Sequence, residues 1–347
     1  MDATNAYVSK NPFNSKGIWL KGNLHTHTTK SDGRLSPLEV IDFYSRAGYD
    51  FLAITDHEKI TRVKSSRISL INGIETSTGR GENGHSYHVV ILGVEDNDEI
   101  QSRRNSIQDL LDYVNENGYL AFIAHPYWSS LTTRDLKEVN GYIGIEVYNT
   151  GCDVEVGKGY STVHWDNVLA SGREILGFAV DDAHRYTIPP IDAPGGWINV
   201  KSEGSSSEYI LEAIKDGAFY ASTGPVIYDF NYSSNTIEAR FTPVARVDII
   251  SKGGIGLSIS EKLLKTIELN ERYWKSGFKG YLKNIEIERE NSFEKIHFVI
   301  GKMKVALIKD TKGITGIRIE SHSLRKYFRL EITDKDYGKA WSNPVLI

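Results

Sequence analysis

The chain has 347 residues, enough for one large domain and a smaller one, each with its own core. Its composition is ordinary for a globular protein, and a formal net charge of -4 gives no basis for tight nonspecific binding to nucleic acid or anionic membranes. The single cysteine, Cys152, excludes an internal disulfide framework. Residues 1–22 lack the pattern of a signal peptide, and no stretch approaches the roughly 20 apolar residues of a membrane span. We therefore expect a soluble, cytoplasmic protein.

Up to about residue 223, short apolar runs alternate with amphipathic segments. The runs predict strands at 19–23, 51–55, 68–74, 88–93, 119–124, 143–148 and 175–180. The amphipathic segments predict helices at 36–48, 99–117 and 207–216. Ser36 and Pro37 suit the N-cap and the first helical position, and Gly48 follows the last turn. Such alternation is typical of βαβ units and a mainly parallel sheet.

The pattern changes after Gly224 and Pro225, where apolar and polar residues begin to alternate. Segments such as TIEARFTP, IHFVIG and YFRLEITDK show the period of half-buried antiparallel strands. We therefore predict an α/β domain over residues 1–225 and a small all-β sandwich over residues 226–347.

Histidine and carboxylate side chains gather at the ends of the predicted strands in the first domain. These candidate metal ligands are His25, His27, Asp32, His57, Glu75, His88, His125, Asp182 and His184. The first two lie two residues apart on one strand and so point to the same face. Most of these motifs, taken singly, are more often structural. Burying so many ionisable groups without an ion would be very costly, however, so the joint pattern predicts a multinuclear metal site.

The donor types also indicate the chemistry. Imidazole and carboxylate suit Zn²⁺, Mn²⁺ or Fe²⁺, whereas Mg²⁺ prefers an all-oxygen shell. A shared carboxylate can bridge two ions about 3.5–4 Å apart, and a metal-bound water that titrates near pH ~7 supplies a hydroxide nucleophile. The sequence therefore predicts a metal-dependent hydrolase.

The segment GNLHTHTTKSDGRLSPLEVIDFYSRAGYDFLAITDH, followed in order by GIE, HVVILGV, AHP and DDAH, resembles the polymerase and histidinol phosphatase (PHP) superfamily of metal-dependent phosphoesterases. The resemblance covers about residues 17–224. It implies a distorted (β/α)7 barrel with a trinuclear site at the carboxyl ends of the strands. The later segments GGWINV, EYILEAIKDGAFYASTGP and YFRLEITDKDYGKAWSNPVLI are similar to two-domain members with a β-sandwich tail.

The resemblance also implies how the ligands divide among three divalent ions. One ion would be held by His25, His27, Glu75 and Asp182. Glu75 would bridge to a second ion, held also by His88 and His125. The third would be held by Asp32, His57 and His184.

We expect the substrate to be a small phosphorylated compound or nucleotide. The mild acidity argues against a polynucleotide, because nucleases usually display a basic stripe. Glu75, Asp182 and His184 would act through the ions that they hold, and Arg185 could donate a fork of hydrogen bonds to a phosphate oxygen or could be a surface arginine. Asp181 could orient a ligand histidine or cap a turn. Tyr127, Trp128, Glu146, Tyr148 and Asn149 are candidates for the pocket wall, and plain packing is the alternative for them.

Other functions use similar ligands. Carbamate hydrolases occur in the same branch of the superfamily, so the hydroxide could cut a carbamate, ester or amide instead. An amidohydrolase also begins with a strand-borne HxH, but it generally ends in a lone aspartate and commonly uses a carboxylated lysine. A binding module with a decayed site is disfavoured, because every ligand position that can be matched is intact.

Overall fold

The computed structural model describes residues 10–274, 282–290 and 292–347, and it divides the chain into two compact units, Met1–Ala221 and Ser222–Ile347. The boundary predicted after residue 225 lies just beyond this division. Across the described ranges, no helix is both long enough and apolar enough to cross a membrane.

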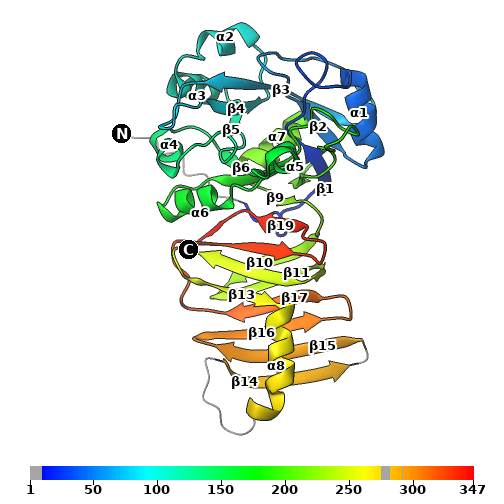
Figure 1. Cartoon of the computed structure of the whole chain (residues 1–347), viewed down its shortest axis with the longest axis vertical. Coiled ribbons are helices and arrows are strands. Elements are labelled where there is room, and N and C mark those ends of the chain that lie inside the picture. The colour runs from blue at the N-terminus through cyan, green and yellow to red at the C-terminus, as the bar shows by residue number, and fades with distance from the viewer. Residues whose placement is uncertain (1–9, 275–281, 291) are drawn as a thin grey trace. The chain divides into compact units, whose positions relative to one another are not determined.

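The wall of the first unit is a sheet in which each strand is hydrogen-bonded to the next along the chain. These strands are β1 (Ile18–Asn23), β2 (Phe51–Ile54), β3 (Ser69–Thr78), β4 (Tyr87–Leu92), β5 (Leu120–Ile123), β6 (Gly144–Asn149) and β7 (Leu176–Val180). Just beyond β1 and β7, Thr26 and Ala183 form a parallel bridge that joins the two ends of this sheet. The predicted distorted (β/α)7 barrel is confirmed (Figure 1).

The sheet is less parallel than the sequence predicted. Strand β4 runs antiparallel to both β3 and β5. Only residues 79–86 connect β3 to β4, and a parallel crossover needs a dozen or more residues, so this connection forms a hairpin. The strands β8 (Trp197–Ser202) and β9 (Phe219–Ser222) were not predicted; β8 pairs antiparallel with the other edge of β1.

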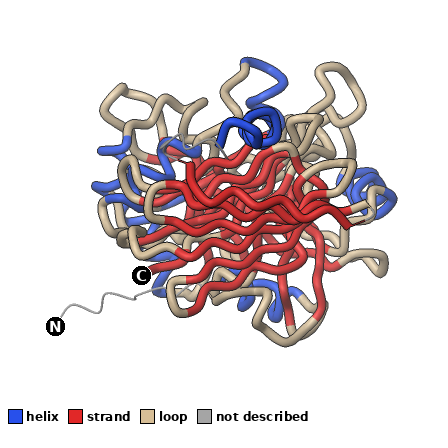
Figure 2. The backbone as a smooth tube through the Cα atoms, turned by 90° about the horizontal axis from the view of Figure 1, so that it is seen from below, coloured by secondary structure: helices blue, strands red, loops and turns tan. Residues whose placement is uncertain are grey.

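Helices lie at the periphery of the strands (Figure 2). They are α1 (Pro37–Arg46), α2 (Asn97–Ser102), α3 (Ile107–Glu116), α4 (Thr133–Glu138), α5 (Thr150–Val156), α6 (Thr162–Ala170) and α7 (Ser207–Lys215). Helix α1 begins after the predicted N-cap Ser36, which forms a capping box with Glu39. The single helix predicted over 99–117 is in fact α2 and α3. Ser106 interrupts it, because this residue is extended and its hydroxyl accepts a hydrogen bond from the N–H of Asp109 as the N-cap of α3.

The core of the first unit fixes where the strands end. Val40 and Tyr44 of α1 pack with Leu52 and Ile54 of β2, and all four are buried. Burial of each large apolar side chain contributes about 1.5–3 kcal/mol to stability. This packing holds the residues that follow β2 in defined positions.

The second unit consists of two antiparallel sheets. One contains β13 (Gly256–Ser260), β12 (Arg246–Ser251), β18 (Tyr327–Thr333) and β19 (Lys339–Ser342), with β20 (Val345–Leu346) also paired to β18. The other contains β10 (Ile227–Ser233), β11 (Thr236–Val244), β17 (Ile314–Glu320), β16 (Met303–Lys309), β15 (Phe293–Ile300) and β14 (Leu282–Glu290), in that order. Phe230 and Phe328 meet between the sheets, with ring centroids 6.1 Å apart. Helix α8 (Glu261–Trp274) follows β13. The predicted β-sandwich is confirmed.

Candidate metal centre

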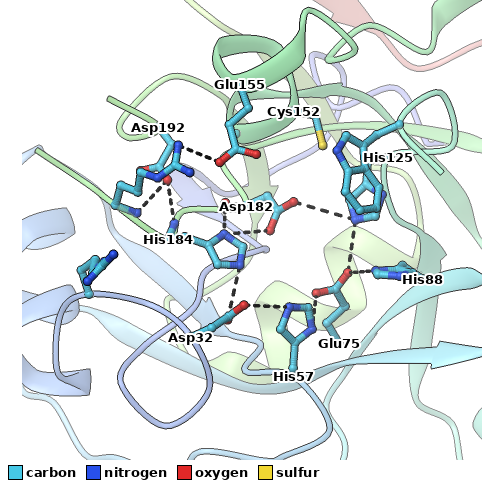
Figure 3. Close-up of a pocket in the computed structure, with 14 residues that line it drawn as sticks. Asp32, His57, Glu75, His88, His125, Cys152, Glu155, Asp182, His184 and Asp192 are labelled. Atoms are coloured by element: carbon cyan, nitrogen blue, oxygen red, sulfur yellow. Dashed lines mark hydrogen bonds and ion pairs between the residues drawn. The ribbon is translucent and has the colours of Figure 1, made fainter. Parts of the chain in front are cut away.

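The candidate ligands come together inside the barrel, although they are spread along the chain from residue 25 to residue 184. His25 and His27 follow β1, His57 follows β2, and His125 follows β5. Glu75 and His88 lie within the paired strands β3 and β4, and Asp182 and His184 follow β7. In Figure 3, the labelled side chains among them point toward a common centre.

The ligand atoms form three overlapping groups, in each of which they lie within 4.8 Å of one another. The first group is His25, His27, Glu75 and Asp182. The second is Glu75, His88 and His125. The third is His27, Asp32, His57 and His184, so the structure adds His27 to the three residues predicted for it. The groups are joined at Glu75 and at His27.

Unpartnered polar atoms in the first group show that the cluster fits a cation. His25 Nε2, His27 Nε2, Glu75 Oε2 and Asp182 Oδ1 are buried without a hydrogen-bond partner. Each imidazole nitrogen lies 3.1–3.2 Å from both carboxylate oxygens. Buried polar atoms without partners are costly, and imidazole with carboxylate is the donor set that suits Zn²⁺, Mn²⁺ or Fe²⁺.

The outer nitrogens of the imidazoles are held by neighbouring side chains. His25 Nδ1 lies 2.6 Å from Glu146 Oε1, and His125 Nδ1 lies 3.0 Å from the Ser129 hydroxyl. In each ring, the contact fixes the orientation and leaves the other nitrogen directed at Glu75.

Opposite charges in the cluster shift one another's pKa toward the charged forms. Burial alone would lower the pKa of His184, but Asp32 and Asp182 raise it to about 9. Burial would raise the pKa of Glu75, but the charge of His25 and the surrounding imidazole hydrogen bonds lower it well below its usual range. A divalent cation must displace imidazole protons to bind here, so binding strengthens as the pH rises.

Buried aspartates anchor the loops that carry the ligands. Asp192 accepts hydrogen bonds from the backbone N–H groups of residues 184–186, at 2.6–2.8 Å. Asp56 accepts hydrogen bonds from the backbone and hydroxyl of Thr28 and from the Ser31 hydroxyl, which fixes the turn after His27. Neither aspartate was predicted to have this role.

Asp181 does not orient a ligand histidine, which was one of the two roles predicted for it. Its carboxylate accepts hydrogen bonds from the N–H groups of Gly195 and Gly196 and from the hydroxyls of Tyr44 and Thr150. Burial raises the pKa of Asp181 to about 6, although these hydrogen bonds oppose the shift. Asp181 therefore ties the end of β7 to the loop before β8.

Two candidate ligands have strained backbones. The φ angles of His125 and Asp182 are 27° and 54°, in the left-handed region that residues other than glycine seldom adopt. Such strain costs on the order of 1–3 kcal/mol and concentrates at functional sites, where the surrounding structure enforces it.

A cavity of about 370 Å³ opens onto the cluster. Beyond the candidate ligands, its lining comprises Arg34, Trp128, Gly151, Cys152, Glu155, Arg185 and Asp192. Arg185 and the predicted wall residue Trp128 thus line the cavity, whereas Tyr127 and Tyr148 are not part of the lining. Glu146 and Asn149 are completely buried among the ligands instead. Arg34 and Glu155 were not predicted, because their sequence neighbourhood gave no sign of which residues would face the cavity.

No family model matches the chain. Curated relatives match it locally. A 3',5'-nucleoside bisphosphate phosphatase of Chromobacterium violaceum is 36% identical over 80 residues, which is 21% of this chain and 27% of the relative. A 5'-3' exoribonuclease of Haemophilus influenzae is 37% identical over 79 residues, or 21% of this chain and 28% of the relative. A phosphoribosyl 1,2-cyclic phosphate 1,2-diphosphodiesterase of Eggerthella lenta is 31% identical over 81 residues, or 21% and 31%.

The alignments therefore span less than a third of the length of each of these relatives. Among solved structures, a two-domain protein of Bacteroides vulgatus that contains a predicted PHP-like metal-dependent phosphoesterase aligns over 100% of this chain and 99% of its own. Its TM-score is 0.48 and its sequence identity is 15%. Over these short stretches, the first unit is similar in sequence to a phosphatase, an exoribonuclease and a cyclic-phosphate diesterase.

Proposed function

We propose that this chain is a metal-dependent phosphoesterase that hydrolyses a small phosphorylated or nucleotide substrate at a trinuclear site. The observation that carries the proposal is the convergence of four buried, unpartnered ligand atoms at the centre of three overlapping groups. The first group would hold the central ion, the second group an ion bridged through Glu75, and the third group an ion on the side of Asp32.

Bound divalent cations would supply Lewis acidity and activated water, the means by which such clusters cleave phosphoesters. The chain's own residues fix the positions of the ligand atoms. His25, His27 and Asp182 direct their ligand atoms to one point, and the left-handed backbone of Asp182 keeps its carboxylate turned into the cavity. This preorganisation contributes most where charge develops on the phosphoryl oxygens.

The size and lining of the cavity support a small substrate. About 370 Å³ accommodates a mononucleotide-sized molecule but not a folded polynucleotide. The indole of Trp128 is 41% exposed and lies edge-on to the rings of His88 and His125, 5.9 and 5.0 Å away. It offers a surface on which a base or aryl group can pack.

Arg185 is the residue that we assign to a substrate oxygen. Its guanidinium lines the cavity and pairs with Glu155 at 2.7 Å. Both side chains are about one third exposed, and such a pair is worth only about 0–1 kcal/mol, so a phosphate oxygen can replace Glu155 as its partner.

The activity is tested with Mn²⁺-loaded protein whose metal content has been measured. Aryl phosphates, mononucleotides and bisphosphonucleotides are assayed beside aryl carbamates and esters. We expect phosphate release from at least one phosphorylated class. Turnover of carbamates or esters alone would indicate a carbamate or ester hydrolase instead. A metal-loaded protein that releases no phosphate would contradict the proposed phosphoesterase activity.

The metal assignment is tested by elemental analysis of an Asp182→Ala variant. Asp182 belongs to the first group and has an unpartnered oxygen directed at its centre, so we expect close to three ions per wild-type chain and a loss of at least one in the variant. Asp336→Ala, at an exposed position in the second unit, is the matched control and keeps the wild-type metal content. Equal metal content in all three proteins would show that the cluster is not the binding site.

The role of Arg185 is tested by Arg185→Gln. Loss of a charged hydrogen-bond donor costs about 1.5–3 kcal/mol, so we expect kcat/KM for the phosphorylated substrate to fall about 10-fold or more, with the metal content unchanged. Arg46→Gln, which removes an exposed arginine on α1, serves as the control. Unchanged kinetics in Arg185→Gln would remove this residue from the site.

A further inference from the structure

Glu146 is a carboxylate that the ligand assignment does not use, although it lies among the ligands. It lies in the middle of β6 and its side chain is completely buried. Among the described residues, no lysine or arginine forms an ion pair with it. A buried carboxylate without a basic partner is expensive, so its contacts must compensate.

One oxygen of Glu146 acts on the first ligand group. Oε1 lies 2.6 Å from Nδ1 of His25, which is also completely buried. A proton on Nδ1, donated to this carboxylate, leaves Nε2 as the lone-pair nitrogen. Nε2 of His25 is one of the unpartnered atoms at the centre of the first group. Glu146 thus selects the tautomer of His25 whose Nε2 can bind a cation.

The other oxygen contacts the second group directly, and it contacts Asp182 through the amide of Asn149. Oε2 accepts hydrogen bonds from the backbone N–H of His125 at 2.7 Å and from Nδ2 of Asn149 at 2.8 Å. The same Nδ2 lies 3.1 Å from Oδ2 of Asp182. The bond to His125 fixes a backbone that is left-handed at this residue.

We propose that Glu146 is a positioning residue that couples the first and second ion sites and leaves the third site independent. The proposal rests on the proposed function, because it needs ions at these groups. Glu146 contacts His25 and His125 directly and Asp182 through Asn149. Within the described part of the chain, it makes no hydrogen bond to Asp32, His57 or His184.

Glutamine cannot replace Glu146, although it has the same shape. If its amide oxygen accepts from His125 and Asn149, its NH₂ group faces the proton on Nδ1 of His25. That contact between two donors favours the other tautomer, in which Nε2 carries the proton and cannot bind a cation. If the amide is reversed, the NH₂ group meets the N–H of His125 and the amide of Asn149 instead.

The test measures bound metal in the full chain, by elemental analysis after dialysis against chelator at increasing concentrations. Loss of a side chain that orients a metal ligand typically weakens metal binding 10–100-fold. We expect Glu146→Gln to release two ions at chelator concentrations about 10–100-fold lower than the wild type, and to retain the third ion as the wild type does. Asp32→Ala is the reciprocal variant and is expected to lose only the third ion.

Two further variants separate positioning from a general effect on folding. Asn149→Asp keeps the acceptor that caps α5 but removes the donor to Glu146 and Asp182, so it should weaken the same two ions. Glu331→Gln removes a buried glutamate of the second unit and should leave all ions bound. Thermal unfolding of the metal-stripped proteins shows whether each variant of the first unit is folded.

The outcomes distinguish this inference from the proposed function. A wild-type chain that binds no divalent metal contradicts the proposed function. A wild-type chain that binds three ions, beside a Glu146→Gln variant with the same chelator profile, contradicts the positioning role alone. Uniform weakening of all three ions in a folded Glu146→Gln variant would contradict the independence of the third site.

Discussion

Asp192 shows how much of the candidate site depends on a single carboxylate outside the ligand set. It is 2% exposed and holds three consecutive backbone N–H groups, those of residues 184–186. Hydrogen bonds to a charged group are worth more than neutral ones, and removal of the acceptor leaves one buried and two partly buried donors unsatisfied. The position of His184, and with it the third ligand group, therefore depends on Asp192.

We expect Asp192→Ala to lower the free energy of unfolding by about 3 kcal/mol, measured by urea denaturation. The third ion should also be bound more weakly, because His184 is no longer held in place. The exposed Asp336→Ala variant is the control for stability. A change in stability below about 0.5 kcal/mol, the range of ordinary surface substitutions, would show that Asp192 does not anchor this loop.

At the same scale, the gathering of the candidate ligands was predictable, and the residues that support them were not. His25 and His27 could be recognised because two ligands share one short motif, and the residues of every other motif lie beside an apolar run. Glu146 and Asp192 instead bond to backbone groups or ring nitrogens, and Glu146 meets His25 across 121 residues of chain. No local spacing reports such a contact.

Among the elements, strands β18 and β19 contain a buried ionic network that ties stability to pH. Glu331 bonds to Arg329 at 2.9 Å and to Lys339 at 2.6 Å, and Arg329 is itself 1% exposed. Burial would raise the pKa of Glu331, but the charges of Arg329 and Lys339 outweigh this and lower it. The carboxylate therefore stabilises the fold above its unfolded pKa of ~4.3, and this contribution is lost as the pH falls through the lower folded value.

We expect Glu331→Gln to lower the free energy of unfolding of the second unit by about 3 kcal/mol at pH 7, because it leaves the buried Arg329 and the half-buried Lys339 with a neutral partner. The difference from the wild type should shrink as the pH falls below ~4. Chemical denaturation at several pH values measures this difference. Glu320→Gln, which removes a more exposed ion pair, is the control. A difference that grows toward low pH would contradict the sign.

The elements themselves were largely predicted where periodicity was strong. The barrel strands β1–β7 and the helices α1 and α7 lie within a few residues of their predicted ranges. The errors have specific causes. The antiparallel direction of β4 follows from the short connection after β3, and the split between α2 and α3 follows from the cap at Ser106. Strand β8 pairs with β1, which lies far from it in the sequence, and no local sequence pattern indicates such a pairing.

At the scale of the whole molecule, the proposed ions belong to one unit only. All candidate ligands lie between residues 25 and 184, within Met1–Ala221. A ligand that binds only the folded state stabilises it by about 2.7 kcal/mol at 100 times its Kd. For a unit of this size, that corresponds to roughly 5–10 °C in Tm.

We therefore expect calorimetry of the full chain to show a transition that falls by several degrees when divalent metal is removed, and a second that does not move. Adding Mn²⁺ back should restore the first transition. Glu331→Gln identifies the other transition, because it lowers the stability of the second unit. Equal shifts of both transitions on metal removal would show that the units do not unfold independently.

The overlap of the three groups also has a kinetic consequence. The side chains of His25, His27 and Glu75 are 0–1% exposed, whereas Asp32 is 55%, His57 32% and His184 27% exposed. An ion at the centre would be enclosed by buried ligands, while an ion beside Asp32 would face solvent directly. We therefore expect metal exchange in stages, with one ion turning over rapidly and the central one remaining for far longer.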